Sequence, residues 1–380
     1  MATSAISVQR YFARLRDPRI NRRKRHLLID IIVIALCGVI CGANDWQEIA
    51  AFGRRRKAWL QDFLALPNGI PSHGTLERVF DRLDPQAFQA CFRQWVEALA
   101  RALDLGHIAI DGKALRRSGS ATKGWAPLHV VSAWATQCHL TLGQVVVDDQ
   151  SNEITAIPRL LELLDLQGAL VTIDAMGCQK EIARKVVQGG GDYVLAVKDN
   201  QPHLLEDIQA VIGKALESDF AGYRHDWHET AERGHGRDES RTYLVLTEPE
   251  GIRDQESWVG LKVVGMCTRT RVVNGEQSDE AHDFIGSRLA GARVYGQALR
   301  NHWGVENSLH WQMDVNFGED ASRVQRRHGA ENLALVRRLA LALLKRHPEK
   351  ASVACKRLSA ALDTAFLEET LRAGCNLGTL

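Results

Sequence analysis

Two short apolar stretches, His107-Ile-Ala-Ile-Asp111 and Ala169-Leu-Val-Thr-Ile-Asp174, decide which fold the sequence predicts. Each has the aliphatic composition of a buried strand, and each ends in an aspartate. Strand ends are where an open α/β sheet presents its ligand-binding groups, so the two carboxylates are expected to face one site. Either aspartate alone could simply begin a turn. The matching pair favours a functional site in an α/β fold.

The segments around these two stretches predict a sheet flanked by helices. The order of patterns is three strands, a helix, a strand, a helix and a strand, followed by a polar, strand-rich segment and two further helices. Strand patterns cover 107–111, 128–136, 139–147, 169–174 and 193–197, and helical spacing covers 154–164, 179–188, 292–313 and 330–344. The strand-rich segment, about 220–290, is interpreted as a β insertion before the helix expected at 292–313.

Three domains are expected along the chain. Residues 1–104 have helical periodicity throughout and predict a small helical domain, while 105–346 hold the predicted sheet. Residues 347–380 form a tail of helical character. The apolar run 27–42 contains Asp30 and is shorter than a bilayer requires, so it predicts a buried helix rather than a membrane span.

Composition limits the class of protein without deciding it. The 380 residues are 45% hydrophobic and 25% charged, as in ordinary globular proteins. Eight cysteines contain no CxxC pair, which argues against a zinc ribbon and predicts a reducing, cytoplasmic compartment. The net charge is only +2, but two segments are strongly basic, as expected for contact with a polyphosphate or for a solvated helix face. The first spans 10–25, and the second comprises Arg323, Arg326, Arg327, Arg337, Arg338, Lys345 and Arg346.

The two strand-end aspartates suggest metal chemistry. Carboxylates held close together repel each other unless a cation lies between them. Mg²⁺ prefers oxygen ligands and needs only one or two protein carboxylates when phosphate oxygens complete its shell. Two such ions, about 3.5–4 Å apart, can activate the attacking oxygen and stabilise the leaving oxygen in phosphoryl transfer.

A third stretch, Asn301-His-Trp-Gly-Val-Glu-Asn-Ser-Leu-His-Trp-Gln-Met-Asp314, supplies a further carboxylate. In a helix, His302, Glu306 and His310 share one face because each is four residues from the next. On one straight helix these three side chains span about 12 Å and cannot converge on one zinc ion. A polar face on a tryptophan-anchored helix is the structural alternative.

Several motifs together resemble the H-repeat-associated transposases, an ISAs-type insertion-sequence family linked to Rhs elements. The resemblance extends over about residues 10–345. It rests on Asp17-Pro-Arg, Gly69-Ile-Pro-Ser-His, Ile110-Asp-Gly-Lys-Ala-Leu-Arg-Arg-Ser, His129-Val-Val-Ser-Ala-Trp, Ser151-Asn-Glu-Ile-Thr-Ala-Ile-Pro, Val171-Thr-Ile-Asp-Ala-Met-Gly-Cys-Gln-Lys-Glu-Ile-Ala, Tyr193-Val-Leu-Ala-Val-Lys-Asp-Asn-Gln and the block 302–320.

The resemblance implies a ribonuclease-H-like mixed sheet whose Asp111, Asp174 and Glu306 are both catalytic residues and ligands of two Mg²⁺ or Mn²⁺ ions. It implies cleavage and strand transfer of double-stranded DNA at insertion-sequence ends and target, by a homo-oligomer on the bacterial nucleoid and without an organic cofactor. Candidate phosphate contacts are Lys113, Arg116, Arg117, Lys198, Arg237, Arg241, Arg300 and His302.

Other interpretations stay open at this point. A nuclease without strand transfer would have the same fold, and a defective transposase would only bind DNA. A phosphatase acting on small molecules is disfavoured by the basic N-terminal segment. Where the family usually has Lys, Gly and Asp, this chain has Gln150, Asp199 and Gly74, and Asp199 adds negative charge beside an expected DNA-facing loop. Glu239 is expected either to support the site or to lie on a solvated strand face.

Overall fold

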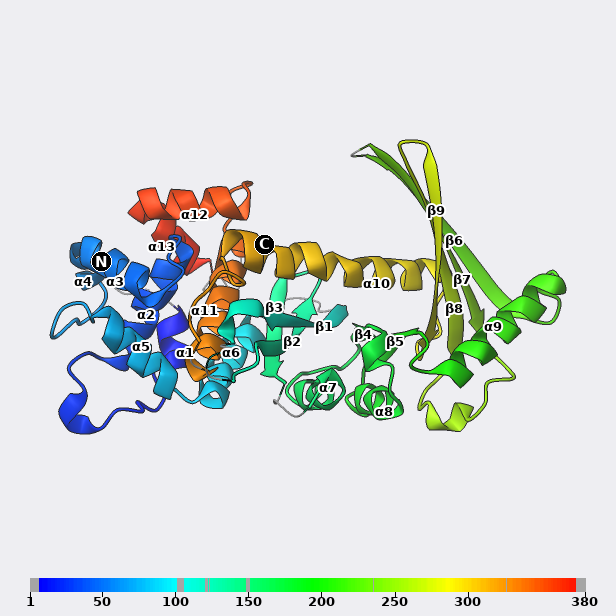
Figure 1. Cartoon of the computed structure of the whole chain (residues 1–380), viewed down its shortest axis with the longest axis horizontal. Coiled ribbons are helices and arrows are strands. Elements are labelled where there is room, and N and C mark those ends of the chain that lie inside the picture. Colours follow the sequence, from blue (N-terminus) through cyan, green and yellow to red (C-terminus); the bar gives the residue numbers. More distant parts are fainter. Residues whose placement is uncertain are drawn as a thin grey trace.

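A computed structural model describes residues 7–100, 106–119, 122, 124–147, 151–234, 236–325 and 327–373. Its centre is a nine-stranded sheet of order β3-β2-β1-β4-β5-β9-β8-β7-β6 (Figure 1). The first five strands are β1 His107–Leu115, β2 Leu128–Ala135, β3 Leu140–Val146, β4 Leu170–Ile173 and β5 Asp192–Val197. The expected α/β class is therefore confirmed.

The first five strands have the ribonuclease-H-like arrangement. Strands β1, β2 and β3 pair in antiparallel succession, and β4 and β5 then add parallel to β1. Parallel neighbours need crossover helices, which explains why helical segments separate β3 from β4 and β4 from β5. These are α7 Glu153–Leu161 and α8 Lys180–Gln188.

Strand β1 is longer than the sequence predicts. The expected end at Asp111 is wrong, because β1 continues to Leu115 and stays paired with β2, with Asp111 opposite Ser132. On its other side β1 pairs with β4, and that pairing ends at Ile110 and Ile173. Asp111 and Asp174, the residue that follows β4, therefore lie side by side where the pairing of β1 with β4 ends.

The strand-rich segment extends this same sheet. It forms β6 Arg224–Gly234, β7 Arg237–Thr247, β8 Val263–Val273 and β9 Glu276–Gly286, joined as antiparallel neighbours. Strand β9 also pairs antiparallel with β5, so Val194 lies opposite Gly286. The long hairpins extend well beyond β5 (Figure 1), and α9 Pro202–Glu217 packs against them.

Helix α10, Ala292–Val305, packs against strands from both halves of the sheet. It contacts β1 and β4 as well as β6 and β7, and it lies on the opposite side of the strands from α7 and α8 (Figure 1). Two π-helical turns continue it, Glu306–His310 and Gln312–Asn316. A π-helical turn is wider than an α-helical one and is often found at functional sites.

Helices from both ends of the chain pack into one helical body (Figure 1). The Arg357 side chain donates to the carbonyl of Val39 at 2.8 Å, and the Trp59 indole donates to Glu368 at 2.9 Å. The helices of this body are α1 Ser7–Phe12, α2 Leu28–Ile40, α3 Trp46–Arg55, α4 Lys57–Gln61, α5 His73–Arg82, α6 Pro85–Ala100, α11 Arg327–Arg346, α12 Val353–Leu362 and α13 Thr364–Arg372. The apolar run forms α2, which is buried, and no helix among the described residues is long and apolar enough to span a bilayer.

Candidate active site

Three carboxylates from distant parts of the chain line one cavity of about 340 Å³. Asp111 comes from β1 and Asp174 directly follows β4, so the parallel register places them next to each other. Glu306 enters from the end of α10, which crosses both strands. The side chain of Asp174 also accepts a hydrogen bond from the Gly177 amide at 3.3 Å, which orients it at the start of the following turn.

The pKa values of Asp111 and Asp174 are both raised. Burial raises the pKa of Asp111 to about 7, and the charges of Asp174, Glu153 and Glu306 act in the same direction. The pKa of Asp174 is also raised, first by burial and then by Glu153. Acids that face one another without a cationic partner destabilise the fold, and a divalent cation removes that cost. The donor set therefore fits a divalent metal ion.

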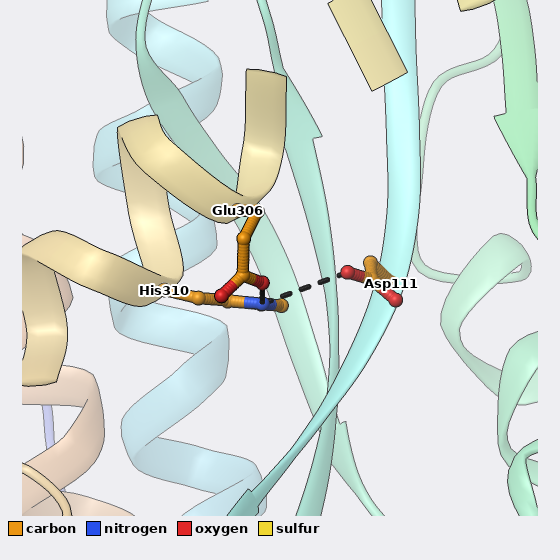
Figure 2. Close-up of side chains that lie close together, drawn as sticks. All are labelled: Asp111, Glu306 and His310. Atoms are coloured by element: carbon orange, nitrogen blue, oxygen red, sulfur yellow. Dashed lines mark hydrogen bonds and ion pairs between the residues drawn. The ribbon is translucent and has the colours of Figure 1, made fainter. Parts of the chain in front are cut away.

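His310 joins this group, although sequence reasoning did not select it (Figure 2). Its Nδ1 lies 3.2 Å from Glu306 Oε2 and 3.5 Å from Asp111 Oδ2, and one ligand atom of each of the three residues lies within 4.8 Å of the others. Burial lowers the pKa of His310, so the ring is neutral near pH 7. Three ligands on one straight helix cannot converge, but here the third ligand, Asp111, comes from β1.

A second pair, His129 and Glu153, was also missed as part of the site. His129 Nε2 lies 2.5 Å from Glu153 Oε1, and this hydrogen bond is the main cause that raises the pKa of His129. A Cβ on Gly112 would lie 2.1 Å from Glu153 Oε1 and 2.6 Å from His129 Nε2. The pair therefore occupies space beside Asp111 that only glycine leaves free. Both residues lie in the motifs that carry the family resemblance, which is the one signal that could have found them.

Basic residues line the same cavity as the acids. Lys198 follows β5, Arg241 lies on β7 and Arg300 lies on α10. Arg241 and Arg300 share Glu239 as an ion-pair partner, and Arg237 lies 3.7 Å from the same carboxylate. The expectation that Glu239 could lie on a solvated strand face is wrong, because its side chain is only 5% exposed. It holds the arginine cluster together.

Comparison with known proteins identifies the family. Residues 102–343 match the family model described as the transposase DDE domain, and residues 9–96 match the model described as DDE_Tnp_1-associated. The chain belongs to the DDE transposase family. It is 39% identical to YncI of Escherichia coli O157:H7, a protein named as a candidate transposase, over 99% of this chain and 97% of that protein.

Two further relatives agree with this assignment. The H repeat-associated candidate transposase YhhI of Escherichia coli strain K12 is 37% identical over 93% of this chain and 95% of its own length. An uncharacterized protein encoded in the dhlA 3′ region of Xanthobacter autotrophicus is 43% identical over 74% of this chain and 94% of its own length. The predicted resemblance to H-repeat-associated transposases is thus confirmed.

Two of the phosphate contacts predicted for this DDE-family chain are engaged elsewhere. Lys113 is 10% exposed and forms ion pairs with Asp314 and with Asp320, the latter at 3.4 Å. His302 Nδ1 and Thr172 Oγ1 share a hydrogen bond of 2.9 Å. Burial lowers the pKa of His302 to about 4. Lys113 is already paired with acids of the chain, and the neutral ring of His302 attracts phosphate weakly. Neither residue is therefore kept as a proposed phosphate contact.

The remaining predicted contacts and the basic runs are divided between surface and interior. Arg116 and Arg117 are exposed but are not among the residues that line the cavity. The second basic run is itself divided, because Arg337 and Arg338 are 2% and 1% exposed whereas Arg323 is exposed. Arg326 of that run lies outside the described residues. In the first run the exposed side chains are Arg10, Arg14, Arg16, Arg22, Lys24 and Arg25.

Proposed function

We propose that this chain cuts DNA strands at the ends of an insertion sequence and joins the freed ends to a target. One observation carries the proposal, namely that Asp111, Asp174 and Glu306 line a cavity that also contains Lys198 and Arg300. An acidic group that binds metal, next to basic groups that bind phosphate, is what phosphodiester chemistry requires. Membership of the DDE transposase family supports the same reaction class.

The three carboxylates are proposed to hold two Mg²⁺ or Mn²⁺ ions. When bound, these ions supply Lewis-acid activation of the attacking oxygen and stabilise the leaving oxygen. Asp111 and Asp174 hold their positions because adjacent parallel strands present them, and Glu306 is carried by a helix that packs on both strands. The rigid elements thus orient the acids before DNA binds.

The basic side of the cavity is proposed to hold the scissile strand. Lys198 is exposed and lines the same cavity as Asp174, so a phosphate at the site could contact it. Arg300, whose side chain is 43% exposed, is proposed to position the adjacent phosphate, with Arg241 held beside it by Glu239. The exposed basic run near the N-terminus is proposed to bind the flanking duplex, with the helical body reading the insertion-sequence ends.

Joining two ends requires at least two copies of the chain on DNA, and a chromosomal substrate implies a location in the bacterial cytoplasm.

DNA binding by the N-terminal segment is best tested by substitution rather than deletion, because the N-terminal helices share hydrogen bonds with α12 and α13. Replacing Arg22 and Arg25 with glutamine should weaken binding to all duplexes and reduce its salt dependence by about one unit for each lost phosphate contact. An unchanged salt slope would show that this segment does not contact DNA.

The deciding experiment measures cleavage and joining of labelled end DNA with Mg²⁺ or Mn²⁺. We expect nicked and joined products from the wild type and none from Asp174→Ala. Cleavage without joined product would identify a nuclease instead. Tight DNA binding without cleavage in either metal would identify a defective transposase and reject the enzymatic proposal.

A further inference from the structure

We propose that His310 supplies a nitrogen ligand to the cation held by Asp111 and Glu306, and that the site therefore favours Mn²⁺ over Mg²⁺. This inference rests on the proposed function, because it adds a ligand to the same metal site. Figure 2 shows the three side chains pointing toward one another from β1 and from the π-helical turn. Their ligand atoms all lie within 4.8 Å of one another.

The local backbone explains why His310 reaches the site. The turn Glu306–His310 is π-helical, and it delivers both of its end residues toward Asp111. His310 Nδ1 lies 3.2 Å from Glu306 Oε2 and 3.5 Å from Asp111 Oδ2, so a single cation could contact all three. His302, four residues before Glu306, belongs to the α-helical part and is bonded to Thr172 instead.

The ring of His310 is buried, with one of its two nitrogens unpaired within the part of the chain that the structure describes. The residue is 3% exposed, and its Nε2 has no hydrogen-bond partner among the described residues. A buried ring nitrogen without a partner is costly, so some other gain must keep the imidazole there. Its Nδ1 faces the two carboxylates, and coordination of a cation at that point provides such a gain.

A nitrogen ligand changes which metals bind best. Mg²⁺ is a hard cation that is bound almost entirely by oxygen, whereas imidazole is a good ligand for divalent ions of the first transition series. A site with two carboxylates and one imidazole therefore binds Mn²⁺ more tightly than Mg²⁺, beyond the preference of an all-oxygen site. The added preference for Mn²⁺ over Mg²⁺ thus depends on one side chain, His310.

The test uses Mn²⁺ itself as the probe on the full-length, metal-free protein. Bound Mn²⁺ is titrated by electron paramagnetic resonance, and pulsed measurements detect ¹⁴N coupled to the ion. We expect a nitrogen coupling in the wild type that changes to the ¹⁵N pattern when the protein is grown with [¹⁵N]histidine. This labelling arm needs no substitution, so it is independent of any folding defect.

Variants then assign the nitrogen. His310→Gln should lose the coupling and weaken Mn²⁺ binding by at least ~10-fold, with a smaller loss for Mg²⁺ measured by competition. His302→Gln is the matched control and should retain the coupling. A residue that only positions Glu306 would weaken both metals equally and show no coupling, which would overturn the inference.

The same titration separates failure of the inference from failure of the proposed function. Mn²⁺ that binds, depends on Asp111 and shows no histidine coupling rejects the nitrogen ligand and leaves the carboxylate site intact. Mn²⁺ binding that is absent, or that Asp111→Ala does not reduce, rejects the metal site itself.

Discussion

Two glutamates beyond α10 have opposite surroundings. Glu306 has a side chain that is 72% exposed, and it faces Asp111 and the neutral ring of His310. Glu319 is completely buried and pairs with Arg338 at 2.9 Å. Burial alone would raise the pKa of Glu319, yet the charges of Arg338, Arg337 and Lys113 hold it below its ordinary value.

The difference separates a functional acid from a structural one. Glu319 is matched by cations of the protein, so it needs nothing from solution and joins β1 to α11. Asp111 instead has other acids as neighbours: burial first, and then the charges of Asp174, Glu153 and Glu306, raise its pKa. An acid whose partners are acids indicates a cation site, whereas an acid whose partners are basic indicates a stabilising ion pair.

The comparison predicts that removing the charge of Glu306 affects reaction rather than stability. Glu306→Gln should lower strand cleavage at least ~10³-fold, because an acid that binds the reacting centre is lost. The free energy of unfolding of the metal-free protein should not fall, since no ion pair of the interior is broken. Glu217→Gln, an exposed carboxylate at the end of α9, is the control and should keep full activity. Loss of stability in Glu306→Gln would contradict the distinction between Glu306 as a functional acid and Glu319 as a structural one.

Glu319→Gln should give the opposite pattern. Arg338 would remain buried without its carboxylate, and breaking a buried pair on one side costs about 3–5 kcal/mol of unfolding free energy. Urea denaturation would measure this loss. Replacing Glu319 and Arg338 together by methionine should recover most of it, because both charges are then removed. An unchanged midpoint in Glu319→Gln would show that the pair is not structural.

The pH dependence of stability should reveal the acids that face one another. In the folded metal-free chain the pKa of Asp111 is about 7, against an ordinary value of 3.8. Between these values the folded state holds a proton that the unfolded state has lost, so stability falls as pH rises from about 4 to 7. Asp111→Asn should remove part of this slope and be more stable than the wild type at pH 8 by roughly 1–3 kcal/mol.

The measurement is denaturant unfolding in a metal chelator across this pH range. Asp62→Asn, an exposed aspartate of the helical body, should keep the wild-type slope. Equal slopes in Asp111→Asn and the wild type would mean that the pKa of Asp111 is not raised in the folded chain.

The smallest expected effect concerns the space beside Asp111. In Gly112→Ala the new methyl group would force Glu153 and His129 to move, because it would lie 2.1 and 2.6 Å from their polar atoms. Such supporting groups affect metal affinity or activity by about 10–100-fold. Gly213→Ala, where an added Cβ meets nothing within 4 Å, is the matched control and should be neutral or slightly stabilising in its helix. Full activity of Gly112→Ala would show that the pair plays no part in the site.

Periodicity predicted the elements well where the apolar pattern was strong. The buried strands that lead to Asp111 and Asp174 and the crossover helices between them follow from local composition. The end of β1 was predicted too early, because its continued pairing with β2 is a non-local contact. The three-domain division and the catalytic roles stay predictions.

Charge was the property that sequence reasoning judged least well. Arg337 and Arg338 have the composition of a DNA-binding run, but the chain folds them into the interior against Glu319. Lys113 follows Asp111 in sequence yet points toward Asp314 and Asp320. The direction of a long charged side chain depends on partners far away in the sequence, so no local pattern reports it.

The sequence by itself determined the family, the order of strands and helices, and the three acids Asp111, Asp174 and Glu306, because motifs and periodicity are local properties. Only the tertiary structure decided that His310, Glu153 and His129 lie beside those acids. It also decided that the strand-rich segment continues the same sheet through β9. Those outcomes depend on the register between strands and on a π-helical turn, and both are set by packing between segments that are distant in the chain.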